Sequence, residues 1–216
     1  MKPSIPPLYL DIETIPSQRA DVMARIARDH VDDDSQKAFA KADSEHRKTA
    51  LSPLFGEVVS FAVADNEGAP RCLSRTRGGS LTEEDLLREL ASIVGEHMAQ
   101  AEREISPIIV GHNVVDFDRH FVARRMIVCG LSPSSVWTMP VKPWDRRIWV
   151  DTMHLWGGKF TRLNDLAMAL SIPGKTGSGA DVYDLWLAGR DEEIRAYNVR
   201  DVEITRAVFL RTEVLW

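Results

Sequence analysis

Two acidic residues, Asp11 and Glu13, stand close together near the N-terminus, in the largely apolar stretch LYLDIET of residues 8–14. If this stretch is a strand, its side chains alternate between the two faces, so both carboxylates point to the same side. Neighbouring carboxylates on an apolar strand repel each other and lose hydration, and a bound cation offsets both costs. Carboxylate oxygens are the ligands that hard divalent cations prefer. The pair therefore predicts part of a divalent metal site.

Two further acidic residues lie far downstream, in patterns that also point to the interior. Asp118 ends the sequence GHNVVDFD of residues 111–118, which follows an apolar run with the pattern of a buried strand. Asp201 ends the sequence YNVRD, residues 197–201, in a segment of helical periodicity. At 100° per residue, Asp201 and Tyr197 share the apolar stripe of that helix, where an unpaired carboxylate is costly. Four inward-facing carboxylates on separate elements imply a metal centre.

Taken in order, the patterns D-x-E-T, N-x-x-x-F-D and Y-x-x-x-D resemble the three motifs of the DEDD 3′–5′ exonucleases. The tyrosine of the third pattern indicates the subgroup found in the proofreading domains of family B DNA polymerases. The chain most resembles the stand-alone predicted exonucleases related to those domains, and the sequence SPLFGEVV, residues 52–59, is similar to that group as well. The resemblance extends from Leu8 to about Phe209. Asp116 competes with Asp118 for the second motif, and the spacing selects Asp118.

This resemblance implies a fold, a reaction and a cofactor. The implied fold is α/β, an RNase H-like mixed central sheet flanked by helices. The implied reaction is hydrolysis of nucleic-acid 3′ ends to nucleoside 5′-monophosphates by a two-metal mechanism, with single-stranded DNA as the expected substrate. The implied cofactors are two divalent cations, Mg²⁺ with Mn²⁺ able to substitute.

The resemblance also assigns a role to each catalytic residue. Asp11 bridges both cations, while Glu13 and Asp201 help to hold the one on the side of the nucleophile. Asp118 acts mainly through the second cation, partly through water. Tyr197, whose ordinary pKa of about 10 leaves it protonated at neutral pH, is a poor general base. We therefore expect its hydroxyl to orient the attacking water by a hydrogen bond.

The residues expected to contact the substrate are less sharply defined, and several of them have a structural alternative. The candidates are Thr14, Asn113, Phe117, Trp144 and Lys175. Asn113 either contacts the substrate or caps the helix that follows it. Phe117 either wedges against the terminal bases or packs beneath that helix.

Three loop residues leave similar choices open. Trp144 belongs to a segment of interleaved aromatic and basic residues, 137–147, which suits stacking of a single strand or, equally, pinning of a loop to the core by its tryptophans. Lys175 lies in a GKT sequence, but Ala169 stands where a phosphate-binding loop requires its first glycine, so a nucleoside triphosphate site is not expected. Lys175 stays a candidate contact to a substrate phosphate. Asp151, at the end of a predicted strand, either supports the metal ligands or caps a turn.

Composition fits a single domain that spans residues 1–216, which the resemblance identifies as a 3′–5′ exonuclease domain. A chain of this length with 44% hydrophobic residues can bury a sizeable core, and its net charge of −5 argues against tight coating of duplex nucleic acid. Cys72 and Cys129 are isolated, so neither a disulfide framework nor a zinc site is expected. No apolar run approaches the ~20 residues that span a membrane, and the N-terminus has no signal-peptide core. We expect a cytoplasmic protein with no membrane partner.

The chain is expected to alternate strands and helices that bring the acidic residues together. Strands are predicted at residues 8–13, 57–65, 71–75, 108–111 and 147–150. Helices are predicted from a capping box at 80–83 to Met98, and at 117–129, 163–170, 180–188 and 192–211. Residues 17–49 are charged, alanine-rich and expected to be helical, an excursion whose role the sequence does not reveal.

Two other functions compete with a DNA exonuclease. One is a 3′–5′ exoribonuclease acting on short RNA, because the discrimination depends on a 2′-hydroxyl that no motif reports. The other is a catalytically silent nucleic-acid-binding module on the same fold, against which the four intact carboxylates argue. The expected partner is nucleic acid with a free 3′ end, single-stranded by preference, and a polymerase or repair protein in trans is compatible with this chain. The biological pathway and the oligomeric state do not follow from the sequence.

Overall fold

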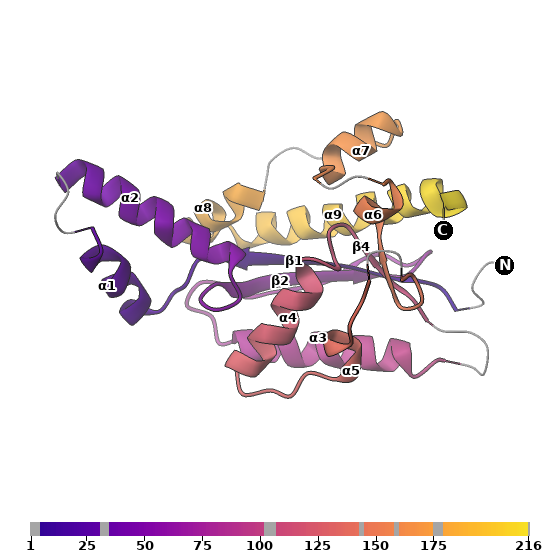
Figure 1. Ribbon diagram of the computed structural model, residues 1–216, viewed down its shortest axis with the longest axis horizontal. Coiled ribbons are helices and arrows are strands. Elements are labelled where there is room, and N and C mark those ends of the chain that lie inside the picture. Colours follow the sequence, from indigo (N-terminus) through magenta and orange to yellow (C-terminus); the bar gives the residue numbers. More distant parts are fainter. Residues whose placement is uncertain are drawn as a thin grey trace.

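A computed structural model describes residues 5–30, 35–101, 107–142, 145–157, 160–174 and 179–215. At its centre, five strands form a sheet in the order β3-β2-β1-β4-β5 (Figure 1). The strands are β1 (Leu8–Ile15), β2 (Glu57–Ala64), β3 (Arg71–Ser74), β4 (Ile109–Gly111) and β5 (Trp149–Asp151). Because β1 pairs antiparallel with β2 and parallel with β4, the sheet is mixed, as the resemblance implies.

Helices cover both faces of this sheet (Figure 1). They are α1 (Ala20–Arg28), α2 (Ser35–Lys48), α3 (Glu83–Met98), α4 (Asp118–Val128), α5 (Ser135–Thr138), α6 (Thr152–Leu155), α7 (Leu163–Ala169), α8 (Val182–Leu187) and α9 (Asp191–Thr212). Short 3₁₀ turns follow α2 at Thr49–Leu51 (η1), precede α8 at Gly179–Asp181 (η2) and end the described chain at Glu213–Leu215 (η3). In Figure 1, α3 and α4 lie on one side of the sheet and α9 runs along the other.

The alternation of side chains along β1 divides the core between these two layers. Leu8, Leu10 and Ile12 belong to the apolar cluster that includes residues of α3 and α4. Tyr9 belongs to the cluster on the opposite face, and its ring lies 6.0 Å from the ring of Phe209 in α9. The acidic residues of β1 therefore face α9, as the period of two predicts.

The pairing of β1 with β2 contains a shift of register beside the second carboxylate. Glu13 lies opposite Ser60, but the next residue, Thr14, lies opposite Val58, so Val59 is an extra residue in β2. Such a β-bulge bends the strand and increases its local twist. The bulge lies just after the two carboxylates, where β1 ends and the chain turns toward the loop that precedes α1.

A buried ion pair fixes the helical layer of α3 and α4 to the start of β2. The Arg125 guanidinium lies 2.6 Å from the Glu83 carboxylate, and both side chains are less than a tenth exposed. Glu83 also accepts a hydrogen bond from the amide of Val58 at 2.7 Å, and Arg125 donates to the carbonyl oxygen of Pro53 at 3.2 Å. Removing either partner would leave a buried charge uncompensated, so this pair is a structural requirement of the fold.

The segment of residues 52–59 owes its glycine to a close approach of the backbone. A Cβ at Gly56 would lie 2.4 Å from the carbonyl oxygen of Thr49, so any side chain there would displace η1 from the strand that follows. The similarity of this segment to the exonuclease group thus has a packing explanation.

The predicted start of α3 is wrong by two residues. The sequence predicts a capping box of Ser80 with Glu83, whereas Thr82 caps the helix and Asp85 completes the box. The physical reason is the inward turn of Glu83, whose carboxylate is taken by Arg125 and the Val58 amide. The remaining predicted strands and helices are present with ends shifted by a few residues, and α5 and α6 are too short for a periodic pattern to reveal.

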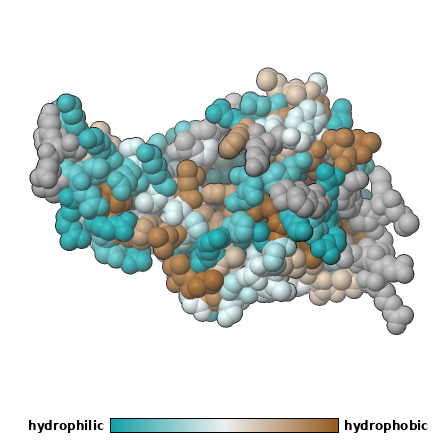
Figure 2. All heavy atoms as spheres, viewed as in Figure 1, coloured by the Kyte–Doolittle hydropathy of each residue, from teal (hydrophilic) through white to brown (hydrophobic). Residues whose placement is uncertain are grey.

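The predicted helical excursion between β1 and β2 forms two helices, α1 and α2, which project beyond the end of the sheet (Figure 1). Figure 2 shows that the visible face of this projection is mostly hydrophilic. Inside it, Val22 and Ile26 of α1 are buried, so the projection has a small apolar interior of its own. None of the helices in the described ranges combines the length and the apolar character needed to cross a membrane.

Candidate metal centre

Three of the four predicted carboxylates converge on one point beside the middle of the sheet. Asp11 and Glu13 reach it from β1 and Asp201 from α9, and one ligand oxygen of each lies within 4.8 Å of the others. Glu13 and Asp201 are 7% exposed, and Asp11 is partly buried. Three anions this close, with little water around two of them, form a site that attracts a divalent cation.

Asp118, the fourth predicted carboxylate, occupies a slightly different position. It is the first residue of α4, is 4% exposed, and accepts a hydrogen bond from the amide of Ile12 in β1 at 3.1 Å. Burial raises the pKa of Asp118 to about 7, the Ile12 amide opposes that shift, and the charges of Asp151 and Asp201 add to it. A cation bound nearby would favour the charged form of this carboxylate. The arrangement is thus three converging carboxylates and a fourth beside them.

A residue that the sequence analysis does not single out, Asn198, holds Asp11 in place. Its side chain is fully buried and donates a hydrogen bond to Oδ2 of Asp11 at 2.6 Å. The amide oxygen in turn accepts a hydrogen bond from the hydroxyl of Ser60 at 2.9 Å. The signal that would have found Asn198 is its spacing, since it lies four residues after Ile194 and four before Val202, both buried on α9.

Tyr197 lies one turn before Asp201 on α9 and is half-buried. Burial raises the pKa of its hydroxyl, and the negative charges of Asp201, Glu13 and Asp11 raise it further. The phenol therefore stays protonated and can donate a hydrogen bond, which is the property that an orienting role requires.

Asp151 organises the loop between β4 and α4. Its carboxylate accepts hydrogen bonds from the amides of Asn113 at 2.9 Å, Val115 at 3.1 Å and Met153 at 2.9 Å. The last of these bonds caps α6, so the turn-capping alternative for Asp151 is correct.

Asn113 has a left-handed backbone, with φ of 62°, a conformation that asparagine tolerates better than most residues. The prediction that Asn113 caps the following helix is wrong, because Phe117 is the N-cap residue of α4 and no side chain caps that helix.

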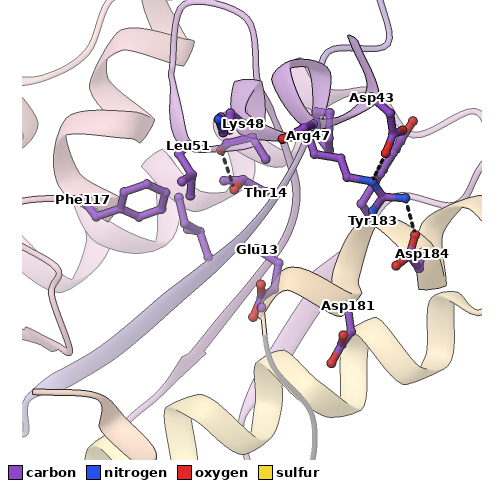
Figure 3. Close-up of a pocket in the computed structure, with 15 residues that line it drawn as sticks. Glu13, Thr14, Asp43, Arg47, Lys48, Leu51, Phe117, Asp181, Tyr183 and Asp184 are labelled. Atoms are coloured by element: carbon purple, nitrogen blue, oxygen red, sulfur yellow. Dashed lines mark hydrogen bonds and ion pairs between the residues drawn. The ribbon is translucent and has the colours of Figure 1, made fainter. Parts of the chain in front are cut away.

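A pocket of about 700 Å³ opens over Glu13, between α2, α4 and α8 (Figure 3). Thr14 and Phe117, two predicted substrate contacts, are in its lining. The ring of Phe117 also packs against Phe121, with ring centres 5.3 Å apart, so the packing alternative for this residue is correct, and its contact with the terminal bases stays a prediction. Phe117 thus lines the pocket and also packs against Phe121 of α4.

Trp144 and Lys175 lie outside the described residues. Within the same aromatic and basic segment, Trp137 is 1% exposed and packs against Trp149, with ring centres 5.4 Å apart. Arg147 pairs with Asp145 at 2.6 Å. Trp137 thus anchors its loop to the core, and the stacking role for Trp144 stays a prediction.

Comparison with known proteins assigns the chain to a class. The domain is α/β, with a mixed sheet, helices on both faces and acidic side chains that meet beside the central strand. Residues 57–216 match the family described as "Predicted 3'-5' exonuclease related to the exonuclease domain of PolB". The chain therefore belongs to this family of 3′–5′ exonucleases, and the resemblance inferred from its motifs is confirmed. Asp118, Tyr197 and Asp201 lie within the matched residues, whereas Asp11 and Glu13 precede them.

The solved structure of a family B DNA polymerase shows the same fold. The family B DNA polymerase from the hyperthermophilic archaeon Pyrobaculum calidifontis aligns with 97% of the chain, with a TM-score of 0.62 and 18% sequence identity. The chain spans 24% of the length of that polymerase. E. coli Exonuclease I, solved in complex with a 5cy-dT13 oligonucleotide, aligns with 96% of the chain and 41% of its own, at a TM-score of 0.41 and 14% identity. No curated protein sequence matches the chain. The predicted RNase H-like fold is confirmed.

The contact between Asn198 and Asp11 leads to a prediction about metal affinity. We expect Asn198→Ala to weaken Mn²⁺ binding by about 10-fold or more, because ligand carboxylates that lose their hydrogen-bond partners bind metals 10- to 100-fold more weakly. Isothermal titration calorimetry measures this affinity directly. Ser60→Ala is the matched control, since it removes one partner of the amide oxygen, leaves the bond from Asn198 to Asp11 in place and should have a smaller effect. Unchanged Mn²⁺ affinity in a folded Asn198→Ala protein would show that Asn198 does not position Asp11.

Proposed function

We propose that this protein is a metal-dependent exonuclease that degrades single-stranded DNA from its 3′ end to nucleoside 5′-monophosphates by a two-metal mechanism. The observation that carries the proposal is the convergence of Asp11, Glu13 and Asp201, whose ligand atoms lie within 4.8 Å of one another. Asp118 supports it, because this carboxylate is bonded to the same strand that carries the first two. Membership of the exonuclease family supports the reaction class.

The donor atoms of the site fit a hard cation. All four side chains offer carboxylate oxygens, which suit Mg²⁺, and Mn²⁺ accepts the same ligands. When bound, two such cations supply an activated hydroxide and stabilise the charge on the departing 3′-oxygen. In this proposal Asp11 would help to hold both cations, and Asn198 fixes the direction of its Oδ2 atom by a hydrogen bond. Glu13 and Asp201 complete the nucleophile side, and Asp118 serves the other, partly through water.

Tyr197 is proposed to position the attacking water and not to deprotonate it. Its hydroxyl has a raised pKa for the reasons given above, so the phenolate needed for general base catalysis is scarce at neutral pH. A protonated hydroxyl one turn from Asp201 can instead donate a hydrogen bond that fixes the direction of attack. Orientation of this kind lowers the entropic part of the barrier.

The shape of the site favours the end of a single strand. A pocket of about 700 Å³ has the size of a small-molecule site, which suits terminal nucleotides and not a double helix. Phe117 and Thr14 form one side of it beside Glu13 (Figure 3). In this proposal both touch the terminal nucleotide, and Asn113, Trp144 and Lys175 contact the strand beyond it.

The substrate and direction of degradation test the proposal as a whole. With Mg²⁺ or Mn²⁺ the purified protein should release labelled mononucleotide from 3′-labelled single-stranded DNA at once. From 5′-labelled DNA the label should first appear in progressively shorter strands and reach the mononucleotide fraction only at the end. Matched blunt duplex should be cut more slowly, because each base-pair step costs about 1–2 kcal/mol to separate. Excess chelator should stop both reactions. Faster cleavage of RNA than of DNA would make the protein an exoribonuclease, and no release from any substrate would indicate a silent binding module.

The carboxylates are tested by removing one charge at a time. Asp11→Asn or Asp201→Asn should reduce kcat by several orders of magnitude, because each residue is proposed to bind a catalytic cation. Thermal stability without metal should stay the same or rise, since like charges in the site are relieved. Differential scanning calorimetry separates this outcome from misfolding. Activity near that of the wild type in either purified variant would contradict the assignment of the metal site.

Tyr197→Phe separates positioning of the water from proton transfer. The ring and its packing remain, and only the hydroxyl is lost, so kcat should fall and yet stay well above that of Asp201→Asn. Steady-state rates of the two variants on the same oligonucleotide give the comparison. Equal inactivity of the two variants would mean that the hydroxyl does more than orient the water.

A further inference from the structure

The excursion between β1 and β2 brings the end of helix α2 to the rim of the candidate site. Three hydrogen bonds fix this end against the chain that leaves β1. The Thr14 hydroxyl donates to the carbonyl oxygen of Ala50 at 2.8 Å, and the Ser17 amide donates to the hydroxyl of Thr49 at 3.0 Å. The third joins a ring nitrogen of His46 to the carbonyl oxygen of Ser17 at 2.7 Å. The last turn of α2 therefore has a defined place beside the carboxylates.

Two cations of this last turn, Arg47 and Lys48, line the pocket over Glu13 (Figure 3). Arg47 is already engaged, because separate nitrogens of its guanidinium lie 2.9 Å from Asp43 and 2.8 Å from Asp184. It also lies over the ring of Tyr183, 5.2 Å from its centre, and so braces α2 against α8. Lys48 differs from it, since it is exposed and forms no ion pair with any residue in the described ranges.

The balance of charge around the pocket gives Lys48 a particular importance. Apart from Arg47 and Lys48, the charged residues of the lining are Glu13, Asp43, Asp181 and Asp184. A nucleic-acid strand carries one negative charge per nucleotide, and the bound cations compensate only the charge on the reacting phosphate. A strand that enters an acidic pocket needs a positive side chain near its next phosphate. Among the described residues of the lining, Lys48 is the cation that is not already paired.

We infer that the α2 end of the excursion is a substrate-binding element, in which Lys48 binds a non-reacting backbone phosphate of the strand. The inference rests on the proposed exonuclease function and adds to it the role of residues 17–49. Arg47 has a separate task, which is to hold α2 at the distance from α8 that keeps the pocket open. Lys48 is then a binding residue that acts on longer substrates and leaves the chemical step unaffected.

Two substrates of different length distinguish this role from a structural one. A short single-stranded oligonucleotide contains non-reacting phosphates, whereas the p-nitrophenyl ester of thymidine 5′-monophosphate contains only the reacting one. Lys48→Ala should raise KM for the oligonucleotide by about 2- to 5-fold with kcat unchanged, as expected for one exposed charge contact. It should leave hydrolysis of the ester unchanged. The slope of log KM against log salt concentration should fall by about 0.7, the value for one phosphate contact on a single strand.

Lys37 provides the matched control, since it is an exposed lysine on the same face of α2, about 16 Å farther along the axis. Lys37→Ala should behave as the wild type on both substrates, and Lys48→Arg, which keeps the charge, should restore most of the lost affinity. Binding of a fluorescent oligonucleotide to Asp201→Asn protein, with and without Lys48→Ala, reports the same contact without turnover.

Each other result overturns the inference in a recognisable way. If Lys48→Ala matches Lys37→Ala on an active enzyme, Lys48 does not bind the strand. If Lys48→Ala reduces activity on both substrates equally and lowers the melting temperature, the lysine only stabilises the C-terminal end of its helix through the helix dipole. A wild-type protein that cleaves neither substrate overturns the proposed function, and this inference with it.

Discussion

Asp11, Glu13 and Asp201 present their oxygens within 4.8 Å of one another, a distance at which like charges repel by about 3 kcal/mol per pair at an effective dielectric constant near 20. A protein that keeps such a group must hold its members by means that do not depend on their mutual contact. Here the peptide backbone and neutral donors do so. β1 carries two of the carboxylates on the central strand of the sheet, and the buried amide of Asn198 donates to one of them. A cation that binds among the three carboxylates relieves their repulsion, and this relief contributes to the free energy of cation binding.

The need to hold mutually repelling carboxylates in place also explains why α9 runs along the sheet (Figure 1). Its buried face supplies Asn198 and Asp201 to the site, and farther along it supplies Val202 and Phe209 to the apolar cluster that contains Tyr9. One helix thus fixes the third carboxylate, and its apolar contacts on either side offset the free-energy cost of burying that carboxylate. On the opposite face, the Glu83–Arg125 pair anchors the layer from which α4 presents Asp118 to the amide of Ile12.

The sequence predicts the parts of this arrangement that depend on period and spacing. Alternation along residues 8–14 places Asp11 and Glu13 on one face, and a period of 3.6 places Asp201 on the buried face of α9. The contact between Asn198 and Asp11 does not follow from such patterns, because it joins residues 187 positions apart through the packing of α9 on β1. The helical period places Asn198 on the buried face of α9, but no local pattern shows that Asp11 is its partner.

The ends of elements and the pocket are likewise set by tertiary contacts. Glu83 fits the pattern of a capping residue, and only the position of Arg125 shows that it is used elsewhere. The charged, alanine-rich composition of residues 17–49 indicates helices but not that α2 returns to the end of β1, since the hydrogen bonds of Thr14 and Ser17 to η1 fix that return. Interactions between distant segments therefore decide where a correctly predicted element lies.

The β-bulge at Val59 has a consequence for how this chain tolerates insertions and deletions. With the extra residue in place, Ser60 lies opposite Glu13 and its hydroxyl reaches Asn198. Deleting one residue of β2 before Ser60 would exchange the two faces of the strand up to that point, or move Ser60 away from Asn198. The length of β2 is therefore tied to the geometry of a side chain on α9, whereas a change of length in the turn of residues 66–69 between β2 and β3 would leave Ser60 opposite Glu13.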